Sequence, residues 1–290
     1  MPADKRGKDA IVLTDASIAR GGRTIWSRGT FAIPTGSVTA IVGTNGAGKT
    51  TLMKAELGLL SLSGGSVRVL DRPAGAATRL IGYVPQSYTS EVDADLSVGQ
   101  YVLLGVNGTR FGPRRTSPTE RDHARRAMAF TGIGDRSEAR LSELSGGLRQ
   151  RAAIAQALAG RPRLLMLDEP LANLDLASQR EIVHVLARLN RELGMTIQVV
   201  AHDLNMLLPI LDGAVYLLDG HPHYAGIHEV MDSGLLTHLY GTQVEVVTTP
   251  QGEMFIQPSA DAPDQGRHDL HSSSEIVNEH RHGRRTGAQA

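Results

Sequence analysis

One glycine-rich segment constrains the fold of this chain more than any other feature, and it reads Gly43-Thr44-Asn45-Gly46-Ala47-Gly48-Lys49-Thr50. It matches the pattern G-x-x-x-x-G-K-[ST], whose backbone N–H groups surround an anion at the start of a helix. The strand-like run Val38–Val42 precedes the segment, and the helix-forming run Leu52–Glu56 follows it. Because strand, loop and helix stand in the required order, the sequence predicts a phosphate-binding loop in an α/β fold.

The residues of this loop predict how phosphates and a metal ion would be held. Lys49 would contact the β- and γ-phosphates, Thr50 would offer its hydroxyl to Mg²⁺, and Thr51 would reach the α-phosphate. The other loop residues would contribute backbone contacts to the nucleotide: Gly43, Asn45, Gly46, Ala47 and Gly48.

A second nucleotide-site pattern lies further along the chain. The apolar run Leu164–Leu167 ends in two carboxylates, Asp168 and Glu169. In this order Asp168 would hold Mg²⁺ through water, and Glu169 would polarise the attacking water as a general base. Two acids at a strand end can also simply cap the next helix, but the phosphate loop upstream favours the nucleotide site.

Residues 11–249 alternate short β-branched runs with longer helical stretches, which indicates an α/β sheet with crossover helices. The runs Leu164–Leu167 and Val199–Ala201 are apolar without alternation, so we expect them at the centre of a parallel sheet. The predicted strands are Ser37–Val42, Gly65–Leu70, Ile81–Val84, Leu164–Leu167, Thr196–Ala201 and Ala214–Leu218.

Strand signals vanish between Ser87 and about Asp135. Here Val98–Leu104 and Glu120–Phe130 are predicted to be helices, joined by the polar loop Asn107–Thr119. We interpret this region as a mostly helical insertion.

Composition excludes several other classes. Thirty Lys and Arg balance thirty Asp and Glu, so no global field points to nucleic acid as a partner. The absence of cysteine excludes disulfides, thiolate zinc sites and cysteine nucleophiles. No window resembles a membrane span, and the opening MPADKRGKDA lacks the apolar region of a signal peptide, so a cytosolic chain is expected.

The segment between the two nucleotide motifs makes the pattern specific. It contains Leu144-Ser145-Gly146-Gly147, followed by the alanine-rich helical stretch Ala152–Ala159. In this order the motifs resemble the nucleotide-binding subunit of an ABC transporter. The resemblance implies a P-loop NTPase core with a mostly parallel sheet, an N-terminal antiparallel β part and a helical subdomain at about residues 87–160.

The same resemblance implies ATP and Mg²⁺ as ligands, with the ion held by Thr50, Gln86 and Asp168. It also implies an ATP-dependent head-to-tail homodimer in which the signature Ser145, Gly146 and Gly147 act in trans, on the γ-phosphate bound by the opposite protomer.

Three further residues fall in family order. Gln86, in Tyr83-Val84-Pro85-Gln86, resembles the Q-loop glutamine that senses Mg²⁺ and the attacking water. Asp175 resembles the D-loop aspartate at the dimer seam. His202, after the apolar strand Gln198–Ala201, resembles the H-loop histidine that hydrogen-bonds the γ-phosphate and helps to hold the water and Glu169.

Two positions depart from the family pattern. The aromatic residue that usually stacks on adenine is missing, and the corresponding stretch is Ala19-Arg20-Gly21-Gly22-Arg23. Either Arg20 stacks through its guanidinium plane or Trp26 reaches in, although a tryptophan here is also typical of core packing. Leu148 replaces the usual glutamine after Gly147, which should leave the Ser145 and Gly147 contacts intact.

A single nucleotide domain resembles the importer layout, which implies a separate membrane permease, an indirect substrate-binding protein and a peripheral place on the cytoplasmic side of the membrane. Three stretches are most similar to zinc and manganese importer ATPases: Tyr101–Gly105, Ala201–Asn205 and Leu235–Gly241. ATPases for siderophore, haem or vitamin uptake stay as alternatives.

Two further classes are disfavoured. A regulatory ABC protein on ribosomes or DNA is disfavoured by the presence of one phosphate loop and by the zero net charge. A switch that binds ATP without turnover is disfavoured by the presence of Glu169 and His202.

The predicted domain is residues 11–250, between a flexible N-terminus (1–10) and a polar tail (251–290) that is expected to be disordered. The tail carries carboxylates and four histidines that suit a zinc-like ion, unless they are incidental to a polar tail. These are His268, His271, His280 and His282.

Overall fold

The computed structural model describes residues 9–86, 95–108 and 115–259. Its centre is a six-stranded sheet in the order β10-β9-β3-β8-β7-β6, parallel throughout except for β10, which is antiparallel to β9. The strands are β3 (Val38–Val42), β6 (Ile81–Val84), β7 (Leu164–Asp168), β8 (Thr196–Val200), β9 (Gly213–Leu218) and β10 (His221–Gly226). All residues of β3, β7 and β8 are buried, as the lack of alternation in β7 and β8 predicts.

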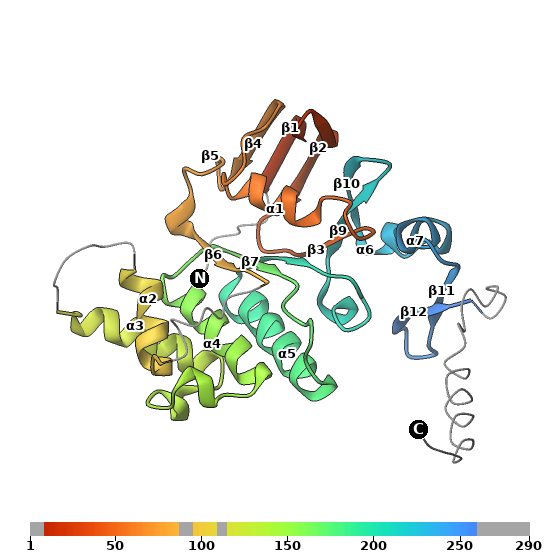
Figure 1. The fold of residues 1–290 in the computed structure, drawn as a ribbon. Helices are drawn as coiled ribbons and strands as arrows, with labels where there is room; N and C mark the ends of the chain where they lie inside the picture. The colour runs from red at the N-terminus through yellow and green to blue at the C-terminus, as the bar shows by residue number, and fades with distance from the viewer. Residues whose placement is uncertain (1–8, 87–94, 109–114, 260–290) are drawn as a thin grey trace, which may run out of the picture.

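A second sheet packs over one face of this centre and is antiparallel, in the order β2-β1-β4-β5. The helix α1 (Lys49–Glu56) lies between the two sheets (Figure 1). The strands are β1 (Asp9–Arg20), β2 (Arg23–Pro34), β4 (Gly64–Val69) and β5 (Arg72–Pro73), and the 3-10 turn η1 (Thr78–Leu80) leads into β6. Asp9 and Ala10, which the sequence placed in a flexible N-terminus, therefore belong to β1.

Three helices pack together beside the central sheet and share its core: α2 (Val98–Asn107), α3 (Pro118–Phe130) and α4 (Gly146–Ala159). Ser97 and Ser117 begin α2 and α3 with capping boxes, in which Gln100 and Glu120 return the hydrogen bond. The predicted loop overlaps both helices at its ends, and residues 109–114 lie outside the described part of the chain. The turns η3 (Gly134–Arg136) and η4 (Leu141–Glu143) lead to α4.

The other face of the central sheet is covered by α4 and α5 (Leu176–Leu193), whose apolar residues share one core with β3, β7 and β8. The chain then continues through η5 (Leu208–Ile210), α6 (Ile227–Val230), α7 (Ser233–Tyr240), β11 (Val244–Thr248) and β12 (Met254–Pro258). Strands β11 and β12 pair as an antiparallel hairpin. The expected start of a disordered tail at residue 251 is therefore wrong, since β12 pairs with β11 and buries Ile256.

Candidate functional site

Four parallel strands bring residues that are distant in sequence to one edge of the central sheet. Gly43 directly follows β3, Gln86 lies two residues after β6, Asp168 ends β7, and His202 lies two residues after β8. Because β3, β8, β7 and β6 are parallel neighbours, their carboxyl ends meet on the same edge. This is the edge where open α/β sheets bind ligands.

The phosphate loop forms an open cradle at the start of α1. Gly43, Gly46 and Gly48 have positive φ angles of 150°, 80° and 101°, which favour glycine. A Cβ atom on Gly48 would lie 2.8 Å from Ile25 Cγ2 and 3.1 Å from Trp26 Cδ1. Within the described structure no side chain caps α1, so the N–H groups of its first turn are open to an anion.

Lys49 and Thr50 connect this cradle to its surroundings. The Lys49 ammonium donates hydrogen bonds to the carbonyl oxygens of Gly43 (2.8 Å) and Thr44 (3.0 Å). Burial lowers the pKa of Lys49, while the nearby carboxylates of Glu169 and Asp168 act in the opposite direction. The Thr50 hydroxyl donates to Asp168 Oδ1 at 3.2 Å, which joins the two nucleotide motifs directly.

Asp168 is buried at the end of β7, with 3% of its surface exposed. Burial is the main cause that raises its pKa, and the neighbouring charge of Glu169 adds to it, whereas the hydrogen bond from Thr50 lowers it. Lys54 and Lys49 also lower this pKa through their charge. A buried carboxylate beside a hydroxyl offers oxygen ligands of the kind that a divalent cation prefers.

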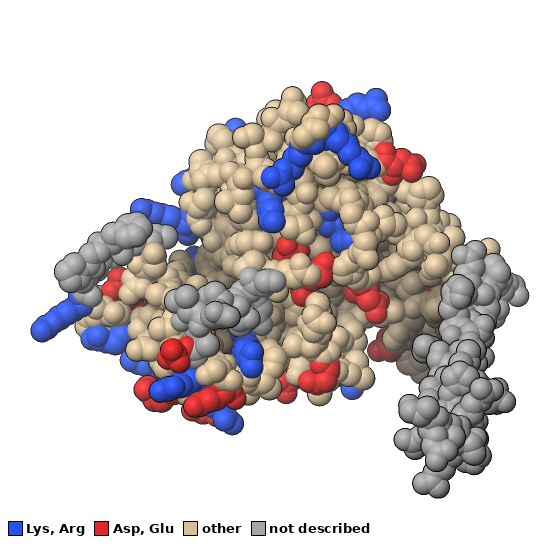
Figure 2. Space-filling view, viewed as in Figure 1, with Lys and Arg blue, Asp and Glu red and all other residues tan. Residues whose placement is uncertain are grey.

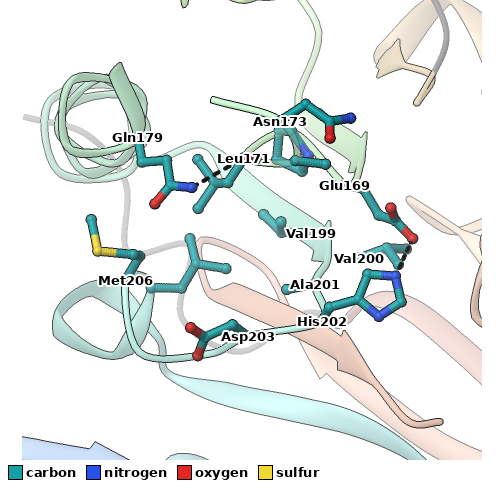
Figure 3. Close-up of a pocket in the computed structure, with 13 residues that line it drawn as sticks. Glu169, Leu171, Asn173, Gln179, Val199, Val200, Ala201, His202, Asp203 and Met206 are labelled. Carbon is teal, nitrogen blue, oxygen red and sulfur yellow. Dashed lines mark hydrogen bonds and ion pairs between the residues drawn. The ribbon is translucent and has the colours of Figure 1, made fainter. Parts of the chain in front are cut away.

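Glu169 stands at the centre of a three-residue chain of hydrogen bonds. Its Oε2 accepts a bond from Gln86 Nε2 at 2.7 Å. Its Oε1 lies 2.6 Å from His202 Nε2, the contact that Figure 3 shows. The backbone of Glu169 has a φ of 52°, and its N–H donates to Val200 O at 3.1 Å. This turn carries the Glu169 side chain over the end of β8 toward His202.

The signature and D-loop residues form a second group, around the starts of α4 and α5. Ser145 caps α4 by accepting a bond from Leu148 N at 3.4 Å, and Asp175 caps α5 by accepting from Ser178 N at 2.9 Å. A Cβ on Gly147 would lie 2.4 Å from Ser178 Oγ, so only glycine lets these two helix starts approach so closely. The same capping bonds from Ser178 lower the pKa of Asp175.

Sequence reasoning missed Gln179. Its Nε2 donates to the carbonyl oxygens of Leu171 and Leu174, both at 3.2 Å. It thereby holds the D-loop turn between Glu169 and Asp175, beside a pocket of about 210 Å³ that Glu169 and His202 also line. One signal was available, because Gln179 lies one helical turn after the cap Asp175 and faces the same loop.

Two predicted groups stand apart from the site. Trp26 is fully buried under the phosphate loop, so it packs in the core and is not available to stack on adenine. Arg20 is exposed at the end of β1, and its stacking stays a prediction. The four tail histidines lie outside the described residues, and within those residues no cluster of three or more His, Asp or Glu side chains is arranged to hold a metal ion.

Comparison with known proteins identifies this arrangement. Residues 27–172 match the sequence pattern of a protein family described as ABC transporter. The chain belongs to the ABC transporter family. As a member it is an ATP-binding subunit with ATPase activity, and its fold is that of a P-loop NTPase.

Individual relatives match this ABC ATPase over most of its length. It is 33% identical to the zinc transport system ATP-binding protein TroB of Treponema pallidum, over 84% of this chain and 91% of that protein. It is 35% identical to the iron(3+)-hydroxamate import ATP-binding protein FhuC of Bacillus subtilis, over 81% and 88%. A solved metal-chelate type ABC transporter in an inward-facing conformation shares the fold, with a TM-score of 0.78 at 24% identity, over 88% of this chain and 99% of that one.

Among the described helices of this ABC ATPase, none combines the length and apolarity needed to cross a bilayer.

Proposed function

We propose that this ABC ATPase energises the import of a divalent metal ion, zinc or manganese, through a separate permease. The observation that carries the ATPase mechanism is the chain of hydrogen bonds from Gln86 through Glu169 to His202, at the sheet edge that also holds the phosphate loop. The relatives named above support the transport role and suggest the cargo.

The residues present fit ATP and Mg²⁺. The open first turn of α1 suits a polyphosphate, because its free N–H groups can bind an anion. The cradle needs glycine at position 48, because a Cβ there would push into Ile25 and Trp26. Lys49 would contact the β- and γ-phosphates, while Thr50, Asp168 and Gln86 would hold Mg²⁺. When bound, Mg²⁺ would neutralise phosphate charge as it develops.

This chain's own residues supply the proton chemistry. Glu169 is the general base: its carboxylate takes a proton from the water that attacks the γ-phosphorus. Gln86 and His202 hold that carboxylate from opposite sides through one oxygen each, which fixes its direction before the reaction. By the family resemblance, His202 would also donate a hydrogen bond to the γ-phosphate.

We further propose that a second copy of the chain completes the site. Ser145, Gly146 and Gly147 lie at the start of α4, where a hydroxyl and helix amides can bind the γ-phosphate held by a partner's loop. Asp175, at the cap of α5, would line the seam between the copies. The starts of α4 and α5 pack closely at Gly147 and Ser178, so the signature and the D-loop would contact the partner together.

The experiment is to purify the tagged chain from mild-detergent membranes, identify its partners by mass spectrometry and measure the metal content of cells that lack it. A polytopic permease together with depleted zinc or manganese supports the proposal. A permease with unchanged metals would overturn the metal cargo and favour a chelate such as iron-hydroxamate. Ribosomes or nucleic acid in place of a permease would overturn the transport role. Acidic and basic side chains are mixed over the face shown in Figure 2, so this face offers no basic surface for nucleic acid.

A further inference from the structure

The side chain of Asn205 bonds the C-terminal hairpin to the segment that carries His202. The amide of Asn205 makes two hydrogen bonds with the backbone of Ile256 in β12: Asn205 Nδ2 donates to Ile256 O at 2.9 Å, and Ile256 N donates to Asn205 Oδ1 at 2.8 Å. The two residues are 51 positions apart in the sequence.

These bonds occupy backbone groups that the hairpin itself does not use. Ile256 faces Val246 in the pairing of β11 with β12. The N–H of Val246 donates to Ser233 Oγ at 3.2 Å, while both polar groups of Ile256 bond to Asn205. The Asn205 amide thus takes the place of a neighbouring strand along β12.

The other end of the connection leads to His202. Asn205 N donates to Asp203 Oδ1 at 2.8 Å, which closes a turn directly after the histidine. Leu204 and Leu207 are fully buried on either side of Asn205 and fix the segment to the core. Tyr240, at the end of α7, packs against the same core as Leu204 and Leu207. Burial and then the charge of Asp203 raise its pKa to about 12.

His202 needs such support because packing alone does not hold its ring. Nearly half of the side chain, 47%, is exposed, whereas 14% of Glu169 is exposed. The direction of the ring toward Glu169 therefore depends on the backbone from Ala201 to Asn205, which Figure 3 shows passing from His202 through Asp203 to Met206.

We propose that Asn205 is a positioning residue for hydrolysis: by holding β12, it fixes the turn that aims His202 at Glu169. The inference rests on the proposed roles of His202 and Glu169. On this proposal the C-terminal hairpin supports catalysis indirectly, through Asn205 and the turn that follows His202.

The first test compares Asn205→Ala with Asn190→Ala in the full chain. Asn190 is a matched control because its Nδ2 also makes two backbone bonds, to Gly36 O (2.7 Å) and Met195 O (3.0 Å), at the opposite edge of the sheet. We expect Asn205→Ala to lower kcat for ATP by about 10- to 100-fold with KM nearly unchanged, because the phosphate loop is untouched. An equal kcat loss in both variants, or none in Asn205→Ala, overturns the inference.

The second test acts on the partner and keeps Asn205. Ile256→Pro removes the N–H that donates to Asn205, whereas Ile256→Ala keeps it and removes only buried side-chain volume. We expect a larger loss of kcat in Ile256→Pro than in Ile256→Ala, at temperatures where melting curves show both to be folded. The reverse order would mean that packing of the Ile256 side chain, not its bonds to Asn205, supports His202.

His202→Ala separates the inference from the function on which it rests. If His202→Ala hydrolyses ATP at the wild-type rate, the proposed role of His202 is wrong. If His202→Ala loses activity while Asn205→Ala retains it, only the positioning role of Asn205 is wrong.

Discussion

His202 Nε2 lies 2.6 Å from Glu169 Oε1, and this contact joins the ends of β7 and β8 across the site. An imidazole that carries its proton on Nε2 donates this hydrogen bond, and the carboxylate oxygen accepts it. This contact supports the unequal roles proposed above, with Glu169 as the base and His202 as the group that orients it.

The first prediction concerns that base. Glu169→Gln keeps the size of the side chain and a hydrogen-bonding oxygen but cannot take a proton from water. We expect kcat for ATP hydrolysis to fall by about 100-fold or more, with ATP binding retained, because general-base catalysis contributes about 10²- to 10⁴-fold. Phosphate release measures hydrolysis, and equilibrium binding measures affinity.

Glu229→Gln, in α6, is the matched control, because it removes the same charge from a helix that carries none of the nucleotide motifs. We expect it to hydrolyse ATP like the wild type. Wild-type turnover in Glu169→Gln would show that another group is the base.

The second prediction concerns the glycines of the phosphate loop. Gly46 and Gly48 both have positive φ, but a Cβ on Gly46 would meet nothing within 4 Å, whereas one on Gly48 would press on Ile25 and Trp26. Gly46→Ala should cost about 1 to 2 kcal/mol from backbone strain alone. Gly48→Ala should cost about 1 to 3 kcal/mol more from overpacking.

Urea unfolding of both variants measures these costs, and ATP binding should be weaker in Gly48→Ala. Equal stability of the two variants would show that Trp26 and Ile25 can move aside without cost.

The third prediction concerns Glu56, a carboxyl group buried at the end of α1. Its Oε1 accepts a bond from Gln198 Nε2 at 3.3 Å, and burial raises its pKa to about 8 from 4.5. Between these two pH values the folded protein keeps a proton that the unfolded chain has released. The free energy of unfolding should therefore fall as pH rises from 4.5 to about 8, by up to about 1.4 kcal/mol per pH unit.

Glu56→Gln removes this titration but keeps a neutral group that can accept from Gln198. Its stability relative to the wild type should increase from pH 5 to pH 8, as urea unfolding at several pH values would measure. Glu253→Gln, at an exposed position, should leave the pH dependence unchanged. A parallel pH dependence in Glu56→Gln and the wild type would rule out Glu56 as the source.

The nucleotide motifs could be placed from the sequence because each is local: a glycine loop between a strand and a helix, or two acids after an apolar strand. The five parallel strands of the central sheet were predicted to within one residue at each end, and in β3, β7 and β8 burial of every residue leaves mostly apolar runs. The antiparallel edge strand β10 was not predicted. The strand β12 was not predicted either, because its few residues become stable only by pairing with β11 and Asn205. Likewise, nothing local shows that Glu56 meets Gln198, 142 residues away.

The last prediction concerns the D-loop support that the sequence did not reveal. Gln179→Ala removes both donors to the carbonyl oxygens of Leu171 and Leu174, so the turn that leads from Glu169 to Asp175 loses its fixed shape. If the D-loop lines the seam of an ATP-bound dimer, this variant should dimerise less. We expect kcat for ATP hydrolysis to fall by about 10-fold. When Gln179→Ala is combined with Glu169→Gln, size-exclusion chromatography should show less ATP-dependent dimer.

Arg180→Ala is the control, because it lies one position along the same helix and is exposed. It should match its parent in both assays. Normal dimerisation with slow hydrolysis in Gln179→Ala would instead limit its role to holding Glu169.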